Sequence, residues 1–158
     1  MNDYAEDLEN EIQRWVTFEL ERETYGISVS DVREVLRFTE IAPVPGAPSY
    51  VVGIINLRGN VVTVIDTRKR FGLGPKENDD ATRIVIIEID GQEVGILVDS
   101  VAEVVDLRLS AIEAAPNVGN EETSRYIQGV TSLDGNLLII VDLNKLLSEE
   151  ELQEISVF

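Results

Sequence analysis

Apolar and polar residues alternate along several short segments of this chain. In WVTFELE, which begins at Trp15, Val16, Phe18 and Leu20 alternate with polar residues, the period of a half-buried β-strand. RIVIIEI, which begins at Arg83, is more continuously apolar, so we expect a more deeply buried strand there. The segments YGISV and EVGILV, which follow these two, predict a partner strand for each. The pattern is typical of a mainly β protein.

The connections between these segments carry turn and loop signals. Asp90-Gly91 is a strong two-residue hairpin signal, and Arg22-Glu23 is a weaker one at the corresponding place. The loop TEIAPVPGAPS holds three of the five prolines and cannot form a regular helix. These signals divide the chain into short strands.

The chain contains one unit twice. Residues 50–71 match residues 126–147, at an offset of 76, at seven of 22 positions. A second match aligns residues 25–35 with residues 94–104 at an offset of 69. Because the two offsets differ by seven, we expect the second copy to have a longer internal connection.

Five short strands and one helical turn in each copy predict two SH3-like β-barrels that pack on one another. We place the first barrel at residues 15–82 and the second at residues 83–147. The expected boundary is the charged, turn-rich stretch 72–82. Both barrels together would form one domain.

Short helices and acidic ends complete this picture. Asp66 and Asp142 each precede a short helical segment and can cap it. Residues 1–14 and 148–158 each carry a net charge of -4 and are expected to be tails that keep the chain soluble. The second tail begins with Ser148 and Glu151 in capping-box spacing, which predicts a C-terminal helix.

Composition then limits the possible functions. The chain has 158 residues and no cysteine or histidine, which excludes disulfides and the usual zinc ligands and counts against most enzymes. A net charge of -17 disfavours nucleic acid and anionic lipid as partners. Apolar runs fall short of the roughly 18 residues that span a membrane, so we expect a cytoplasmic protein without direct membrane insertion.

Few residues suggest catalysis or ligand binding. Asp66 and Asp142 resemble a carboxylate pair, but helix capping explains both, and catalysis through them is our least favoured hypothesis. Gly72-Leu73-Gly74 and the acids at 77–80 lack the patterns of a nucleotide loop or a calcium loop. We therefore predict no cofactor, no metal and no catalytic residue. The basic cluster at 68–70 could bind an acidic partner as an exposed helix face, but we favour a role in local charge balance.

The tips of the two repeated hairpins differ in one charge. Gly59 and Gly135 are shared, as a turn with positive φ requires, whereas Arg58 is replaced by Asp134. Glu34 occurs in the Val-x-Glu-Val segment of the first copy and could form a two-point bond with Arg58. An exposed Arg58 without a partner is the alternative. In the second copy, Glu103 would meet Asp134 in the same geometry.

With these residues the chain resembles the CheW-type coupling proteins of bacterial chemotaxis, over about residues 15–147. The resemblance rests on YGI at 25–27, VREV from Val32, NLRG at 56–59, DTR from Asp66, and VGI with VD at 94–99. NLRG in its hairpin is the most specific element.

The resemblance implies a non-catalytic adaptor, made of two SH3-like barrels, that joins the cytoplasmic tip of methyl-accepting chemotaxis receptors to the regulatory domain of a CheA-family histidine kinase. We expect a monomer when free, recruited to receptor arrays. The implied receptor-coupling residues are Val32, Glu34, Gly53, Asn56, Arg58 and Gly59. The implied kinase-binding residues are Ile41, Pro43, Val44 and Pro45.

Two departures from the family pattern and one alternative function remain. Thr63 stands where the family commonly has proline, and Thr67 where it often has leucine, so the strand at Thr63 could pair differently. The alternative function is a free-standing sensor that binds a small ligand in the seam between the barrels.

Overall fold

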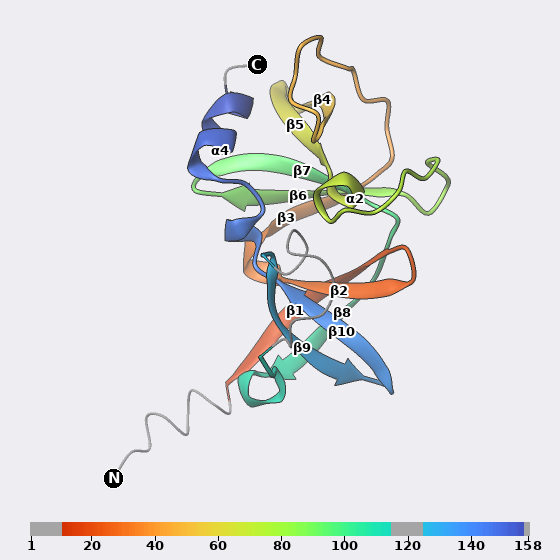
Figure 1. Cartoon of the computed structure of the whole chain (residues 1–158), viewed down its shortest axis with the longest axis vertical. Coiled ribbons are helices and arrows are strands. Elements are labelled where there is room, and N and C mark those ends of the chain that lie inside the picture. Colours follow the sequence, from red (N-terminus) through yellow and green to blue (C-terminus); the bar gives the residue numbers. More distant parts are fainter. Residues whose placement is uncertain (1–10, 115–124, 157–158) are drawn as a thin grey trace.

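The computed structural model describes residues 11–114 and 125–156, in which the chain forms two five-stranded β-sheets stacked on one another (Figure 1). Sheet A has the order β8-β1-β2-β10-β9: Ser100–Arg108, Ile12–Leu20, Glu23–Ser28, Asn136–Val141 and Ile127–Leu133. Sheet B has the order β3-β6-β7-β5-β4: Val32–Arg37, Arg83–Ile89, Gln92–Val98, Asn60–Asp66 and Val51–Leu57. The predicted mainly β fold, with two five-stranded units, is confirmed.

The two sheets have the same plan, but each takes strands from both copies of the repeat. Sheet A combines the first two strands of the first copy with the last three of the second, and sheet B has the reverse composition. Barrels over 15–82 and 83–147 therefore do not describe the sheets, and this prediction is wrong. Sheet B is the continuous segment 32–98, whereas sheet A is built from segments on either side of it.

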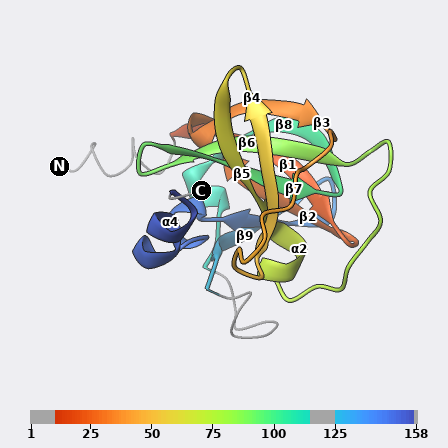
Figure 2. The ribbon, with the colours of Figure 1, turned by 90° about the horizontal axis from the view of Figure 1, so that it is seen from above.

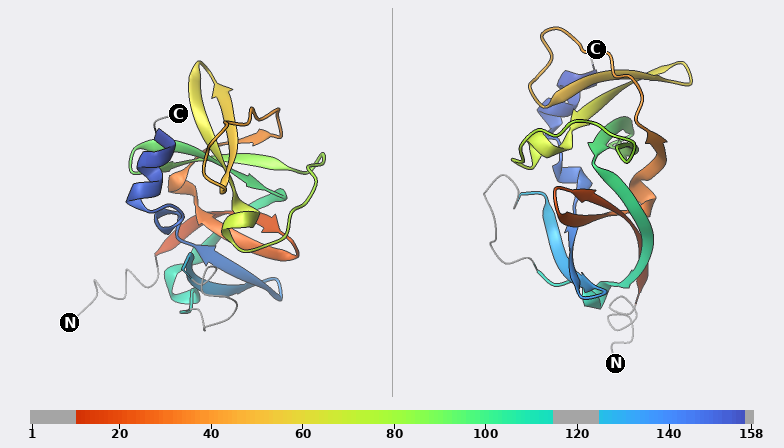
Figure 3. Two further views of the ribbon diagram at one scale, coloured as in Figure 1. Left: turned by 45° about the horizontal axis from the view of Figure 1, so that its top comes forward. Right: turned by 90° about the vertical axis from the view of Figure 1, so that its right-hand side faces the viewer.

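The short connections explain this exchange. In sheet A, β2 and β8 both pair antiparallel with β1, and in sheet B, β7 and β3 both pair antiparallel with β6. If the second and third strands of one copy lay in the same sheet, they would therefore run parallel to each other. A parallel return within one sheet needs a crossover of about a dozen residues. The 3-10 turn η1, Val29–Asp31, has three, and Asp99 alone joins β7 to β8. The chain therefore runs on into the other sheet, as the right-hand view of Figure 3 shows for β8.

The stretch 72–82 is irregular, as predicted, but it is not a boundary between sheets. It follows the short helix α2, Thr67–Arg70, and leads into β6, so it joins two strands of sheet B. The β4–β5 hairpin crosses over the other strands of that sheet (Figure 2).

Three hydrophobic clusters stabilise the fold in the described part of the chain. The largest fills the seam between the sheets, and strand β6 supplies Val85 and Ile87 to it. On the opposite face of β6, Ile84 and Ile86 join the smaller core of sheet B. The prediction that RIVIIEI is a more deeply buried strand is confirmed, because residues 84–87 are fully buried. Trp15 anchors the corresponding small core of sheet A.

Both repeated hairpins turn through two residues with positive φ. The angles are 51° and 87° at Arg58-Gly59, and 50° and 82° at Asp134-Gly135. This left-handed pair is the type I′ geometry that matches strand twist. The β1–β2 turn lies at Glu21-Arg22, one residue earlier than predicted, with Glu21 at φ 57°.

The predicted caps are confirmed. Asp66 accepts the Lys69 N–H at 3.0 Å at the start of α2. Asp142 accepts the Asn144 N–H at 3.0 Å at the 3-10 turn η3, Leu143–Lys145. A second 3-10 turn, η2, spans Leu109–Ala111 after β8.

The C-terminal helix α4, Glu149–Ser156, begins with the predicted capping box. The Ser148 N–H donates to Glu151 at 3.0 Å, and the Glu151 N–H donates to the Ser148 hydroxyl at 3.1 Å. Ile155 is buried in the seam cluster. None of the helices in the described part of the chain is long and apolar enough to cross a membrane. Residues 1–10 of the predicted acidic tail lie outside the described residues.

Candidate functional site

The tip of the β4–β5 hairpin is tied to the edge strand β3 by an ion pair. Both terminal nitrogens of Arg58 donate to the Glu34 carboxylate, one of them at 3.3 Å, in the two-point arrangement that the sequence predicted. The Arg58 side chain is 71% exposed and that of Glu34 is 25% exposed. The pair thus fixes the orientation of a guanidinium that stays open to solvent.

The electrostatics of this tip favour a charged Arg58. The hydrogen bond and the charge of Glu34, with a smaller contribution from Glu93, raise the pKa of Arg58. The turn itself is held by Asn56, whose side-chain oxygen accepts the Gly59 N–H at 2.9 Å. Two of the six predicted coupling residues, Asn56 and Gly59, therefore build the turn that presents Arg58.

The equivalent place in sheet A has no such pair. Glu103 and Asp134 line one hollow of about 140 Å³ together with Glu19. Within the described residues, none of these three acids forms an ion pair with a basic side chain. The sequence expectation that Glu103 would lie near Asp134 agrees with this arrangement.

Two other predicted coupling residues have structural roles. Val32 is half-buried and packs on the seam cluster. Gly53 is required by close packing, since a Cβ there would lie 2.2 Å from the carbonyl oxygen of Ala42. Gly129, its counterpart, meets the carbonyl oxygen of Glu113 in the same way at 2.6 Å. Because both copies share this close contact, we assign Gly53 and Gly129 to packing within the fold.

The four residues predicted to contact a kinase lie on the loop between β3 and β4. Pro43 and Pro45 are exposed, while Ile41 and Val44 are half-buried. A turn from Val44 to Ala47, which contains Pro45, closes with a hydrogen bond of 3.1 Å from the Ala47 N–H to the Val44 carbonyl. The loop is bridged to β4 by the pairing of Ala42 with Ile54.

The favoured role of the basic cluster at 68–70, local charge balance, agrees with the ion pairs of Arg68 and Arg70, but these two arginines do not form an exposed helix face. Arg68 is 11% exposed and joins the two sheets: it bonds Asp99 at 2.6 Å, the Gly74 carbonyl at 2.8 Å, and Glu21 in the β1–β2 turn. Arg70 donates to the Leu146 carbonyl at 3.0 Å and pairs with Glu151.

These contacts of Arg68 and Arg70 were not predicted, because their acceptors lie far away in the sequence. The sequence signal that could have found Arg68 is the difference between copies, since its counterpart is Asn144.

Thr63 also has an unforeseen role. It pairs normally with Ile54 and Val94, so the expected change of strand pairing does not occur, and its hydroxyl donates to the Ile155 carbonyl at 3.4 Å.

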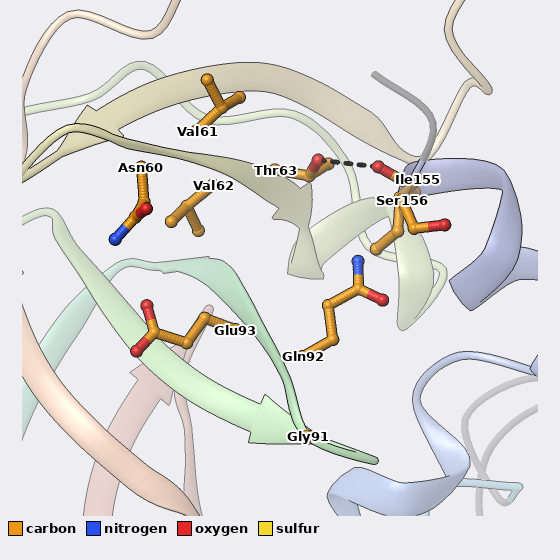
Figure 4. Close-up of a pocket in the computed structure, with 9 residues that line it drawn as sticks. All are labelled: Asn60, Val61, Val62, Thr63, Gly91, Gln92, Glu93, Ile155 and Ser156. Carbon is orange, nitrogen blue, oxygen red and sulfur yellow. Dashed lines mark hydrogen bonds between the residues drawn. The ribbon is translucent and has the colours of Figure 1, made fainter.

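The seam between the sheets is filled by side chains. Phe18, Tyr25, Phe71 and Tyr126 form a continuous row of rings with centroids 5.3 to 5.6 Å apart. An open hollow of about 530 Å³ lies elsewhere, between β5, the β6–β7 turn and the end of α4 (Figure 4). Asn60 and Val62 line one side of it, and Gln92 and Glu93 line the other. The geometry gives no support to a ligand site in the seam.

No candidate metal cluster is found among the described residues. Asp66 and Asp142 are both engaged in helix capping. The observed arrangement therefore offers a presented guanidinium and exposed loops, which suit contact with other proteins.

Comparison with known proteins gives a consistent result. The profile of the CheW-like domain matches residues 14–151. A "Chemotaxis protein CheW" of Bacillus subtilis is 37% identical over 141 residues, which cover 89% of this chain and 90% of the relative. One of Treponema pallidum is 33% identical over 145 residues, covering 89% of this chain and 85% of the relative.

A solved structure is similar as well. The crystal structure of the scaffolding protein TtCheW from Thermoanaerobacter tengcongensis superimposes with a TM-score of 0.79 at 38% sequence identity. The match covers 87% of this chain and 89% of that chain.

Proposed function

This chain belongs to the CheW-like family of chemotaxis scaffold proteins, and from that premise we propose that it is a non-catalytic adaptor that couples methyl-accepting receptors to a CheA-family histidine kinase. Its place of action would be the cytoplasmic face of membrane-associated receptor arrays. Glu34 and Arg58 would contact the receptor tip, and the loop that holds Pro43 and Pro45 would contact the kinase.

The observation that carries this proposal is the Glu34–Arg58 pair. An exposed, oriented guanidinium on a rigid hairpin can bind a carboxylate or backbone carbonyl of a partner with little loss of side-chain entropy. The ion pair is not needed for folding, since sheet A has the same hairpin with Asp134 at this position. Its presence in one copy therefore supports a role in binding.

The test is kinase control in a reconstituted array of receptor, kinase and this protein. Arg58→Glu should abolish receptor control of kinase activity, because Glu34 and the new carboxylate repel one another and the tip loses its cation. Arg22→Glu makes the same charge change at another exposed turn and should leave control intact. Normal control with Arg58→Glu would refute the assignment.

A charge swap separates orientation from charge. The double variant Glu34→Arg with Arg58→Glu restores an ion pair but places the cation on β3. If control stays absent, the guanidinium must be at the tip. If control returns, the pair acts by holding the hairpin, and direct receptor contact by Arg58 would be excluded.

A further inference from the structure

The end of strand β3 carries a second basic feature, separate from the hairpin tip. Arg37 lies directly opposite Arg83 in the antiparallel pairing of β3 with β6, so both side chains are on one face of the sheet. With the exposed ring of Phe38 they line an open hollow of about 500 Å³, whose rim also includes Asp79 and Asp80. Like charges directly opposite one another destabilise a strand pair.

Sheet A shows what the fold requires at this position. There the equivalent pair is Arg14 opposite Asp106, joined by an ion pair of 2.9 Å. The counterpart of Phe38 is Leu107, which is 8% exposed and lies in the core, whereas Phe38 is 38% exposed. An opposite-charge pair and a buried apolar residue at these positions are thus compatible with the fold. At the equivalent positions, sheet B has two arginines and an exposed phenylalanine instead.

Arg37 and Arg83 do not use all their hydrogen-bond donors within the described part of the chain. One terminal nitrogen of Arg83 donates to the carbonyls of Asp80 and Thr82, at 2.7 and 2.9 Å. Among the described residues Arg37 forms no ion pair. The guanidinium of Arg37 is thus open to a partner.

Among the described residues, neither Asp79 nor Asp80 forms an ion pair with Arg37. The Asp79 carboxylate is turned into its own loop, where it accepts the N–H groups of Ala81 and Thr82 at 2.9 and 3.2 Å. The Ala81 hydrogen bond, together with Lys76, lowers the pKa of Asp79.

We propose that Arg37, Arg83 and Phe38 form a docking site for an acidic segment of a protein partner. A glutamate or aspartate side chain would lie between the two guanidinium groups, which match a carboxylate in shape. A neighbouring apolar residue would pack on the Phe38 ring. The acids on the rim and the net charge of -17 disfavour a dianionic phosphate more than a single carboxylate. This site does not use Glu34 or Arg58 and goes beyond the proposed receptor coupling.

The first experiment titrates the full chain, labelled with ¹⁵N, with the acetylated tripeptide amide leucine–glutamate–leucine. Saturable shifts are expected at the backbone amides of residues 36–39 and 79–84. The matched peptide with glutamine in the centre should bind at least tenfold more weakly. Equal binding of both peptides, or shifts spread over both sheets, would overturn the proposal. Equally strong binding of inorganic phosphate at the same amides would overturn the assignment to a protein carboxylate.

The decisive variant is Arg37→Asp, which transplants the arrangement of sheet A. The new aspartate should form an ion pair with Arg83 like that of Arg14 and Asp106, so the melting temperature should stay the same or rise. The glutamate peptide should bind at least tenfold more weakly. Arg108→Asp makes the same charge change at an exposed arginine of β8 and should change binding less than threefold. Unchanged binding in Arg37→Asp, or an equal loss in Arg108→Asp, would refute the site while leaving the receptor-coupling test unaffected.

Discussion

The two hairpin tips have nearly the same backbone but opposite charge. Arg58-Gly59 and Asp134-Gly135 agree within a few degrees in φ, yet Arg58 is paired with Glu34, whereas Asp134 shares a hollow with other acids. The duplicated unit keeps the residues that turn, pack and cap. The charges around the tip are free to differ, because an exposed charge contributes little to the fold.

The same contrast extends to the neighbouring strands. Arg33 pairs with Glu88 in sheet B, and the equivalent positions in sheet A hold Ala102 and Glu19. Glu19 instead accepts a hydrogen bond from the Ser100 hydroxyl at 3.2 Å. Sheet B therefore presents organised cations, and sheet A presents an acidic hollow, on a common scaffold.

The largest expected effect tests what the two copies share. Gly53→Ala should cost about 3 kcal/mol of unfolding free energy, because the new methyl group would overlap the Ala42 carbonyl. Gly129→Ala should be costly for the same reason but less so, since its contact is 2.6 Å rather than 2.2 Å. Urea denaturation measures both. Gly74→Ala, which would meet no atom within 4 Å, is the control and should change little.

The next effect tests a difference between the copies. Arg68→Ala should lower the unfolding free energy by about 2 kcal/mol, because it leaves the shielded carboxylate of Asp99 without its cation. Asn144→Ala, at the equivalent position, should cost less than about 0.5 kcal/mol. Equal effects of the two substitutions would contradict the role of Arg68 as a clamp between the sheets.

The caps should behave alike. Asp66→Ala and Asp142→Ala should each cost about 1 kcal/mol, since each removes the acceptor for a backbone N–H. Asparagine caps almost as well, so Asp→Asn at either position should be nearly neutral in thermal denaturation. A large loss with asparagine would show that the charge itself is required.

A smaller effect depends on pH. Burial alone would raise the pKa of Glu151, but the Ser148 N–H and the Arg70 guanidinium outweigh it and lower that pKa. The folded chain therefore gains stability from this carboxylate above its ordinary pKa of 4.5, and loses it as pH falls through the lower folded pKa. Glu151→Gln should lower the melting temperature at pH 7, and the difference should vanish well below pH 4.5. A difference that persists in acid would contradict this linkage.

The smallest effect concerns the tip itself. Arg58→Asp gives sheet B the tip of sheet A, and the denaturation midpoint should not change measurably, because Arg58 is exposed and aspartate already occupies this turn in the other copy. A clear loss of stability would show that the pair supports the hairpin and would weaken its assignment to binding.

The local structure could be predicted from the sequence because it depends on neighbouring residues. The Asp-Gly turns, the caps at Asp66 and Asp142 and the capping box at Ser148 are set by short-range patterns. The Glu34–Arg58 pair was also predictable, because the comparison of the two copies singled out Arg58.

The exchange of strands was not predicted, because the two copies offer chemically similar partners. Strand β2 could pair with β5 or with β10, and local patterns do not distinguish them. The length of the connection does: three residues between β2 and β3 are too few for a return within one sheet. The clamps of Arg68 were missed because Glu21 and Asp99 approach it only after this exchange.

The exchanged topology also gives the chain an order of assembly during synthesis. Sheet B is one continuous segment, so all its strands can leave the ribosome and pair before β9 and β10 follow. The β1–β2 hairpin emerges before sheet B, yet its partner for residues 24–26 is β10, which emerges after sheet B. The free edge of β2 therefore stays open to wrong pairing until β10 has emerged. Sheet A, which begins before sheet B in the chain, can only be completed after it.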